Sequence, residues 1–246
     1  MGFYLLRKGF TMRATDIRAK ARRVLSGRWF VAIIAGIIAT MFGAASGFTF
    51  NFDFDSLDLG GSTEGLSSFA PQFDPNTSIP LLIGAGVAML VYVAIMFVLA
   101  CVISVGYAEF NLDLVDRYTP RIRTLFSHFG QTKTAVVAAL MIFVRMLIGT
   151  IFFIIPGIIA AYKYFAVYYI IAENPYISAK EALEKSKEVM WHNKWRAFCL
   201  DLSFIGWDLL SALTLGIASI WITPYRQTAH AIFYRQILKE QEEAYW

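Results

Sequence analysis

The chain has 246 residues, of which 57% are hydrophobic and only 16% charged, and its mean hydropathy is +0.54. A soluble domain of this length normally carries about a quarter charged residues, so the composition excludes an ordinary soluble protein and indicates an integral membrane protein. The formal net charge is +4, but the basic residues flank apolar runs and do not gather on one face, which argues against a nucleic-acid partner.

Residues 1–28 form a basic segment ahead of the first apolar run, and Asp16 is its one acidic residue. Its basic residues are Arg7, Lys8, Arg13, Arg18, Lys20, Arg22, Arg23 and Arg28. Four apolar residues recur in it at helical spacing, namely Ile17, Ala21, Val24 and Leu25. This pattern predicts a cytoplasmic amphipathic helix on the inner membrane surface, with the N-terminus inside.

The first apolar run, residues 29–48, is long enough to span a bilayer. It ends in small residues at 43–47, as the cleavage region of a signal peptide does. The basic segment before it is longer than the start of a signal peptide, however, and has helical periodicity. We therefore expect the run to be retained as a first span, and a cleaved signal peptide is the alternative.

Residues 49–79 contain no Lys or Arg and are rich in Gly, Ser and Pro. Their acidic residues are Asp53, Asp55, Asp58, Glu64 and Asp74. This composition predicts an acidic external loop. The next apolar run, 79–105, is expected to be a second span, because it leads back to a basic inner segment. The basic residues of that segment are Arg117, Arg121, Arg123 and Lys133.

Residues 135–172 are almost uninterruptedly apolar, and one straight helix of this length would extend over about 57 Å, against about 30 Å of hydrocarbon. Pro156 and Gly157 lie near the midpoint, which predicts a break in the helix there. A hairpin with limbs at 135–155 and 158–172 keeps the basic residues of the next polar segment, which follows residue 172, on the cytoplasmic side. The return limb would measure about 22 Å, so it is expected to be re-entrant or to thin the bilayer.

Ser178-Ala179-Lys180-Glu181 matches the capping box that opens a helix, and amphipathic spacing continues to about Trp191. The apolar face of this helix would consist of Ala179, Ala182, Leu183, Ser186 and Met190. We expect this face to rest on the membrane or on the helical bundle. Lys185 and Lys187 would then contact anionic lipid headgroups.

The last apolar region, 197–237, is interrupted at 214–216, much as the preceding one is interrupted at Pro156 and Gly157. We therefore expect a second pair of short helices with a break at Gly216. The predicted fold class is all-α: a polytopic helical membrane bundle of six transmembrane or partly re-entrant helices with amphipathic surface helices. Four or five spans are the alternatives.

The expected organisation is one transmembrane domain between two cytoplasmic segments. The basic segment covers 1–28, the helical domain covers 29–238 and includes the external loop, and a tail covers 239–246. The C-terminus is expected inside, like the N-terminus.

Four ionisable residues lie inside the predicted spans, namely Arg145, Lys163, Asp201 and Asp208. An ionisable side chain in a bilayer costs at least a few kcal/mol unless it is paired or hydrated. We therefore expect an intramembrane polar network in which Arg145 and Asp208 lie at comparable depth. Such a network either holds the helices together or lines a water-accessible cavity for an ion, a proton or a headgroup.

The sequence predicts no metal site, no cofactor and no catalytic residues. Cys101 and Cys199 are two isolated thiols in apolar segments, and His128, His192 and His230 have no ligand spacing. Ridges of small residues on the first two spans let helices pack closely. Packing within the chain is the first interpretation of these ridges, and a homodimer is the alternative.

Several longer motifs resemble a known family. They are Arg18-Ala19-Lys20-Ala21-Arg22 ahead of Trp29, Ile155-Pro156-Gly157-Ile158-Ile159, Ala172-Glu173-Asn174-Pro175, Glu181-Ala182-Leu183, Ser186, Met190, Leu202-Ser203-Phe204-Ile205-Gly206-Trp207, Pro224-Tyr225 and Phe233-Tyr234. On these motifs the chain resembles an uncharacterised bacterial integral-membrane family, domain of unknown function 975, over most of residues 12–238. That family is similar to the membrane-embedded portion of some bacterial glycerophosphodiester phosphodiesterases. The resemblance implies a bacterial cytoplasmic membrane and no assigned activity.

The leading functional hypothesis is a non-enzymatic helical membrane protein that binds lipids or a membrane-protein partner. The alternative is a small transporter or channel component that uses the buried charges and the broken helices. An intramembrane enzyme is a third interpretation, in which Glu173, Asn174 and Asp201 would be the polar groups near the inner face.

Overall fold

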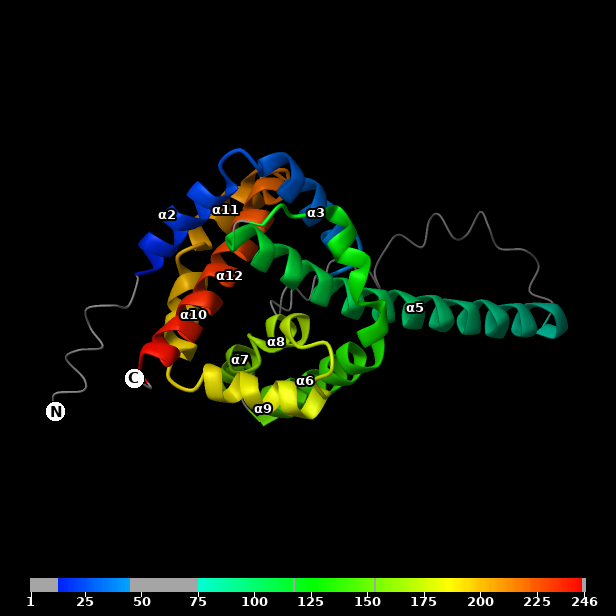
Figure 1. The fold of residues 1–246 in the computed structure, drawn as a ribbon. Coiled ribbons are helices and arrows are strands. Elements are labelled where there is room, and N and C mark those ends of the chain that lie inside the picture. The colour runs from blue at the N-terminus through cyan, green and yellow to red at the C-terminus, as the bar shows by residue number, and fades with distance from the viewer. Residues whose placement is uncertain (1–12, 45–74, 117, 153, 245–246) are drawn as a thin grey trace.

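The computed structural model describes residues 13–44, 75–116, 118–152 and 154–244 (Figure 1). Every regular element in these ranges is helical, as the all-α prediction requires. In chain order they are α2 (Ala14–Leu25), α3 (Trp29–Met41), α5 (Pro75–Val115), the 3-10 helix η3 (Ile122–Gln131), α6 (Thr132–Phe152), α7 (Ile154–Lys163), α8 (Val167–Glu173), α9 (Ala179–Val189), α10 (Lys194–Leu202), α11 (Ile205–Leu213) and α12 (Ser219–Ala244). Arg7, Lys8 and most of the expected loop, including its five acidic residues, lie outside the described residues.

The amphipathic helix expected in the basic segment is α2, and its apolar face packs against protein. Ile17, Ala21 and Leu25 are buried at successive helical turns, and α2 packs on α12. Arg18 donates to the carbonyl oxygen of Ser203 at 2.8 Å, and Arg22 donates to the Tyr225 hydroxyl at 3.2 Å. The chain then turns through 106° into α3. Thus α2 belongs to the folded bundle, and its apolar face is not available to a membrane.

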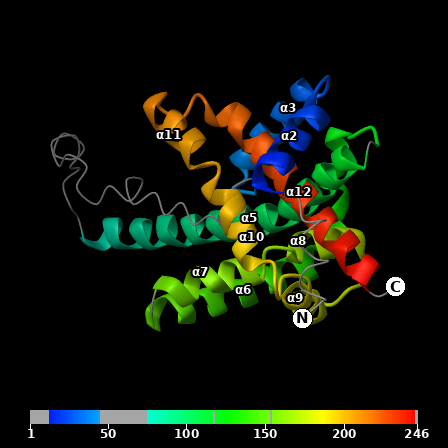
Figure 2. The ribbon, with the colours of Figure 1, turned by 90° about the vertical axis from the view of Figure 1, so that its left-hand side faces the viewer.

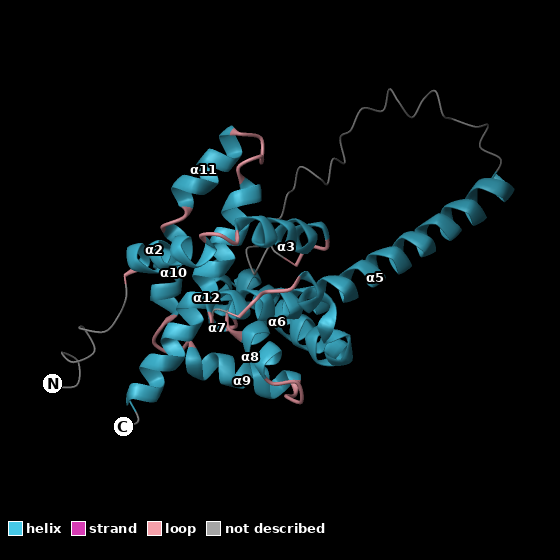
Figure 3. Cartoon of the chain, turned by 45° about the horizontal axis from the view of Figure 1, so that its top comes forward, coloured by secondary structure: helices cyan, strands magenta, loops and turns pink. Residues whose placement is uncertain are grey.

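Helix α5 has 41 residues and two different halves. Its first half extends away from the other helices (Figure 3), and the consecutive apolar residues 89–93 are all exposed there. Since consecutive residues point in different directions around a helix, residues 89–93 present apolar side chains on every side. Its second half lies in the bundle, where Val102, Ile103 and Val105 are fully buried.

Helices α6 and α7 form a hairpin, in which α6 ends at Phe152 and α7 begins at Ile154. Pro156 is in the first turn of α7, where a missing backbone N–H costs little. The break therefore precedes Pro156 and Gly157 by about one turn. Gly157 allows the two limbs to approach, because a Cβ atom on it would lie 2.3 Å from the Thr150 hydroxyl oxygen.

Helices α11 and α12 form the second hairpin, after the short helix α10. Its tip covers residues 214–218, where Leu215 and Gly216 have positive φ angles of 50° and 85°. A glycine takes such a conformation without strain, so Gly216 suits the turn. Gly216 thus lies at the tip of the hairpin, whereas Pro156 and Gly157 lie just past the other tip.

The structure does not support the expected count of six spans. Within the described part of the chain, two helical stretches are long and apolar enough to cross a membrane, Gly86–Val115 and Ile122–Ile151, and a third is added if the bent pair α2 and α3 is counted as one. The count fails because one limb of each hairpin is short. Helix α7 has 10 residues and α11 has 9, which correspond to about 15 Å and 14 Å.

Three apolar ends of the structure lie on one side in one view. Figure 2 shows the first half of α5, the α6–α7 tip and the α11–α12 tip on one side, and the last turns of α12 on the opposite side. Exposed apolar side chains cover all three ends, and Ile151 and Leu215 beside the two tips are 73% and 94% exposed. The described part of the molecule therefore has an apolar side and a charged side.

Candidate functional site

The two hairpins carry charged residues at matching distances from their tips. Arg145 lies about two turns, or about 12 Å, before the α6–α7 tip, and Lys163 lies about three turns after it. Asp208 and Arg226 occupy the corresponding positions around the α11–α12 tip. Of the four residues predicted to form one network, Arg145 and Lys163 therefore belong to the first hairpin and Asp208 to the second.

In the first hairpin, both cations lie against one aromatic ring. The guanidinium carbon of Arg145 is 5.4 Å from the centroid of the Tyr164 ring, and the Lys163 Nζ atom is 5.9 Å from the same centroid. These are cation–π distances. The Nη1 atom of Arg145 is buried and has no hydrogen-bond partner in the described structure. The two cations therefore share one aromatic contact, the Tyr164 ring.

Two further lysines extend this group. Burial, together with the charges of Lys187, Lys194 and Arg145, lowers the pKa of Lys163 below its ordinary value. Lys163 itself lies outside the two helices long enough to cross a membrane. We call Arg145, Lys163, Lys187 and Lys194 the basic cluster. No ion pair is found for any of the four among the described residues.

Helix α9 is placed by a hydrogen bond that brings Lys187 toward this group. The Ser186 hydroxyl, on the buried face of α9, donates to the backbone oxygen of Lys163 at 3.1 Å. Lys187 follows Ser186 directly and is half-buried, whereas Lys185 lies on the exposed face. The helix begins as predicted, since the Ser178 hydroxyl accepts from the backbone N–H of Glu181 at 3.2 Å. The two lysines predicted to contact headgroups therefore have different surroundings.

Beside Arg145, the surface of α6 is hollowed into an open apolar depression. Its volume is about 290 Å³, and it is lined by Arg145 with Leu140, Met141 and Val144. Leu140 and Val144 are exposed. A cation at the edge of an apolar groove suits an amphipathic ligand with a negative head.

In the second hairpin, the acid is paired. Asp208 forms an ion pair with Arg226 across the two limbs. Arg145 is thus not the partner of Asp208, and an Arg145–Asp208 ion pair is not formed. The predicted network is divided between two hairpins, of which only the second contains a carboxylate at this depth among the described residues.

Asp201 forms a separate group one helix earlier, on α10. Its carboxylate lies 2.6 Å from His230 Nε2 and accepts from the Tyr162 hydroxyl at 2.9 Å. Asp201 lies outside the two stretches long enough to span. Burial alone would raise the pKa of this carboxyl, but His230, the Tyr162 hydroxyl and Arg226 outweigh burial and lower the pKa below its ordinary value.

A third group joins the end of α5 to α8 and α12, and sequence reasoning did not find it. Arg235 forms ion pairs with Asp116 and Glu173, and the Tyr234 hydroxyl donates to Glu173 Oε2 at 2.6 Å. Because these residues are far apart in the chain, their spacing carries no signal. Lys194 and Arg226 were also missed, although a count of turns from each helix break would have indicated Arg226.

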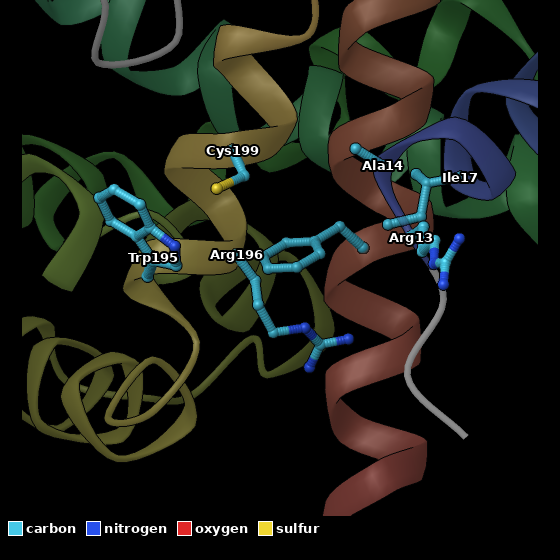
Figure 4. Close-up of a pocket in the computed structure, with 7 residues that line it drawn as sticks. Arg13, Ala14, Ile17, Trp195, Arg196 and Cys199 are labelled. Carbon is cyan, nitrogen blue, oxygen red and sulfur yellow. The ribbon is translucent and has the colours of Figure 1, made fainter. Parts of the chain in front are cut away.

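A pocket of about 280 Å³ lies between α2, α10 and α12 (Figure 4). The close-up shows Arg196 extending from α10, with Cys199 one turn further along the same helix. Arg196 makes a two-fold contact with Glu240, at 2.7 Å and 3.0 Å, and also donates to Asn193. Its charge is therefore neutralised within the protein.

The described residues contain no group of three or more His, Cys, Asp or Glu that could hold a metal ion. Comparison with curated proteins and comparison with solved structures each found no match. A family model described as a protein of unknown function, DUF975, matches residues 61–241, which is more than half of the chain. The chain therefore belongs to the DUF975 family of proteins of unknown function.

Proposed function

We propose that this chain is a non-enzymatic integral membrane protein of the bacterial cytoplasmic membrane that binds lipid through its embedded hairpins. In this proposal the first apolar run, 29–48, crosses the bilayer outward and α5 crosses it back. The α6–α7 and α11–α12 hairpins enter the inner leaflet and turn back near its midplane. Both chain ends then lie in the cytoplasm.

The observation that carries the proposal is the distribution of exposed apolar side chains. They gather on the first half of α5 and at the two tips, which lie on one side in the view of Figure 2. A monomeric soluble protein rarely exposes a contiguous apolar patch of more than a few hundred Å². We therefore expect these apolar surfaces to be covered in the cell. Lipid covers all of them at once, including residues 89–93 of α5, which are apolar on every side.

The dimensions support entry to half depth. The hydrocarbon core of a bilayer is about 30 Å thick, so its midplane lies about 15 Å from each edge. The charged residues of each hairpin lie about 12–15 Å from its tip. With the tips at the midplane, Arg145, Lys163, Asp208 and Arg226 lie at the inner headgroup level, where charge is tolerated.

The charges on the opposite side support the orientation. The arginines of α2 lie on a helix that packs on α12, and the lysines of α9 follow the first hairpin in the chain. Positively charged residues favour the cytoplasmic side. Both hairpins begin and end on that side, so neither needs to move its flanking charges across the membrane.

Membrane embedding is tested by washing membranes at alkaline pH, which releases peripheral proteins. The protein is expected to remain in the pellet and to leave it only in detergent. Release by the alkaline wash would contradict the proposal.

The hairpin depth is tested in variants that lack Cys101 and Cys199 and carry a single new cysteine, Ile151→Cys, Leu215→Cys or Tyr176→Cys. The first two cysteines should resist a membrane-impermeant maleimide from either side. Tyr176→Cys, at a fully exposed position before α9, should react from the inside. Labelling of the tips from the outside would instead indicate complete crossings, and solute flux into vesicles would favour a transporter.

A further inference from the structure

The basic cluster brings together four cations from four helices, and none of them forms an ion pair with a carboxylate of the described residues. Arg145 comes from α6, Lys163 from α7, Lys187 from α9 and Lys194 from α10. Lys194 also lies 5.3 Å from the centroid of the Trp191 ring, so it too has an aromatic contact and no ion pair among the described residues. Like charges held this close disfavour the folded state unless an anion lies among them.

Arg145 gives the second indication of a ligand. Its Nη1 atom is buried and makes no hydrogen bond to any described residue. A buried guanidinium N–H without an acceptor costs free energy, because buried donors are normally hydrogen-bonded. A phosphate oxygen is the acceptor that a guanidinium and neighbouring ammonium groups bind most effectively.

We propose that the basic cluster binds the phosphate of an anionic phospholipid of the inner leaflet, and that one acyl chain of this lipid lies along the exposed apolar side chains of α6 between Arg145 and the tip. This deepens the proposed function and rests on it. Arg145 and Lys163 contact the phosphate from the two limbs of the hairpin, while Lys187 and Lys194 close the site from the cytoplasmic side. Ile148 and Ile151 are exposed on the tip side of Arg145, which is the depth of the acyl chains, whereas the depression extends from Arg145 toward the base of α6.

The second hairpin explains why the site is on the first one. At the same distance from its tip, Arg226 is neutralised by Asp208. The α11–α12 hairpin therefore has a built-in counter-ion, and the α6–α7 hairpin takes its counter-ion from the membrane. The comparison also specifies the ligand: it must be negatively charged and must be present at the inner headgroup level.

The experiment measures lipid adducts by native mass spectrometry of the full chain purified in a non-ionic detergent. The protein is titrated with phosphatidylglycerol, with phosphatidylcholine of the same acyl chains, or with inorganic phosphate. We expect phosphatidylglycerol to bind at least about tenfold more tightly than either alternative, because it combines a net negative charge with an acyl chain. Removal of each cation should weaken its binding by roughly fivefold.

The variants are chosen with matched controls. Arg145→Gln, Lys163→Gln and Lys187→Gln should each weaken phosphatidylglycerol binding, and Lys163→Arg should retain it. Lys185→Gln removes the same charge from the exposed face of α9, and Lys133→Gln removes one from the exposed base of α6, so neither should change it. Lys187 is half-buried and makes no ion pair among the described residues, so Lys187→Gln is expected to fold. This variant therefore tests the site even if Arg145→Gln does not fold.

Equal binding of the two lipids, or equal losses in Lys187→Gln and Lys185→Gln, would overturn the lipid site. Inorganic phosphate that bound as tightly as phosphatidylglycerol would assign the cluster to a free anion and overturn the acyl-chain part. The alkaline wash is applied to the same samples. Loss of lipid selectivity in protein that stays in the membrane refutes this site alone, whereas release of the unmodified protein refutes the proposed function.

Discussion

Asp208 and Arg226 form an ion pair that ties the two limbs of the α11–α12 hairpin together, about two to three turns from its tip. The side chain of Arg226 is mostly buried, at 20% exposed, and it also lies 5.4 Å from the centroid of the Phe204 ring. The pair thus joins α11 to α12 at the level where the α6–α7 hairpin has two cations. The same depth is neutral in one hairpin and doubly positive in the other.

A double-mutant cycle of Asp208→Asn and Arg226→Gln should give a favourable coupling free energy of about 0.5–1 kcal/mol, because the pair is partly exposed. The thermal unfolding midpoints of the four proteins in detergent provide the measurement. The exposed pair of Lys239 and Glu243, at 3.7 Å, serves as the control and should show a coupling near zero. Similar couplings for the two pairs would mean that Asp208 and Arg226 do not hold the hairpin.

Gly106 is a position where α5 lies tightly against η3. A Cβ atom on it would lie 2.3 Å from the backbone oxygen of Leu125, so Gly106→Ala must displace the backbone of η3. We expect this substitution to destabilise the protein by about 1–3 kcal/mol. Gly84→Ala, on the same helix with nothing within 4 Å, should be neutral or slightly stabilising. Equal midpoints for the two variants would contradict the close approach.

The fold class and the two interruptions followed from the sequence because they depend on local properties. Apolar runs, the capping box at Ser178 and the conformational freedom of Gly216 act within a few residues. The span count did not follow, because hydropathy cannot distinguish a limb that crosses a bilayer from one that turns back. The return limb after Pro156 was expected to continue to 172, but α7 ends at Lys163 and the chain then turns into the core.

The partners of the charged residues were harder to predict than their positions. Arg145, Lys163, Asp201 and Asp208 were identified because ionisable residues are rare in apolar runs. Their pairing depends on how the hairpins rotate and pack, and periodicity carries no information about that. Asp201 and Asp208 are about two turns apart on the chain, yet they bind different partners, because a break between α10 and α11 separates them.

The pH dependence of stability should contain a contribution from Asp201. The pKa of this carboxyl is lowered in the folded protein, so it stabilises the fold fully above its unfolded-state pKa of about 3.9. This contribution is lost as the pH falls through the lower folded-state pKa. Asp201→Asn should therefore lower the unfolding midpoint near neutral pH and flatten its fall below about pH 4. His230→Gln should flatten the same region in part, and Glu243→Gln, at an exposed position, should leave it unchanged.

Trp221 reports directly on how deeply the second hairpin enters the bilayer. It lies on the first turn of α12, about 8 Å from the α11–α12 tip, and is 51% exposed. In a variant that retains Trp221 alone, lipids brominated near the end of the acyl chain should quench its fluorescence about twofold more than lipids brominated near the headgroup. A variant that retains Trp195 alone, on α10, should be quenched weakly by both. If the hairpin crossed the whole bilayer instead, Trp221 would lie near the outer headgroups and the shallow bromines would quench it more strongly. The two outcomes separate a hairpin that turns at the midplane from a pair of complete spans, which is the distinction that the sequence alone left open.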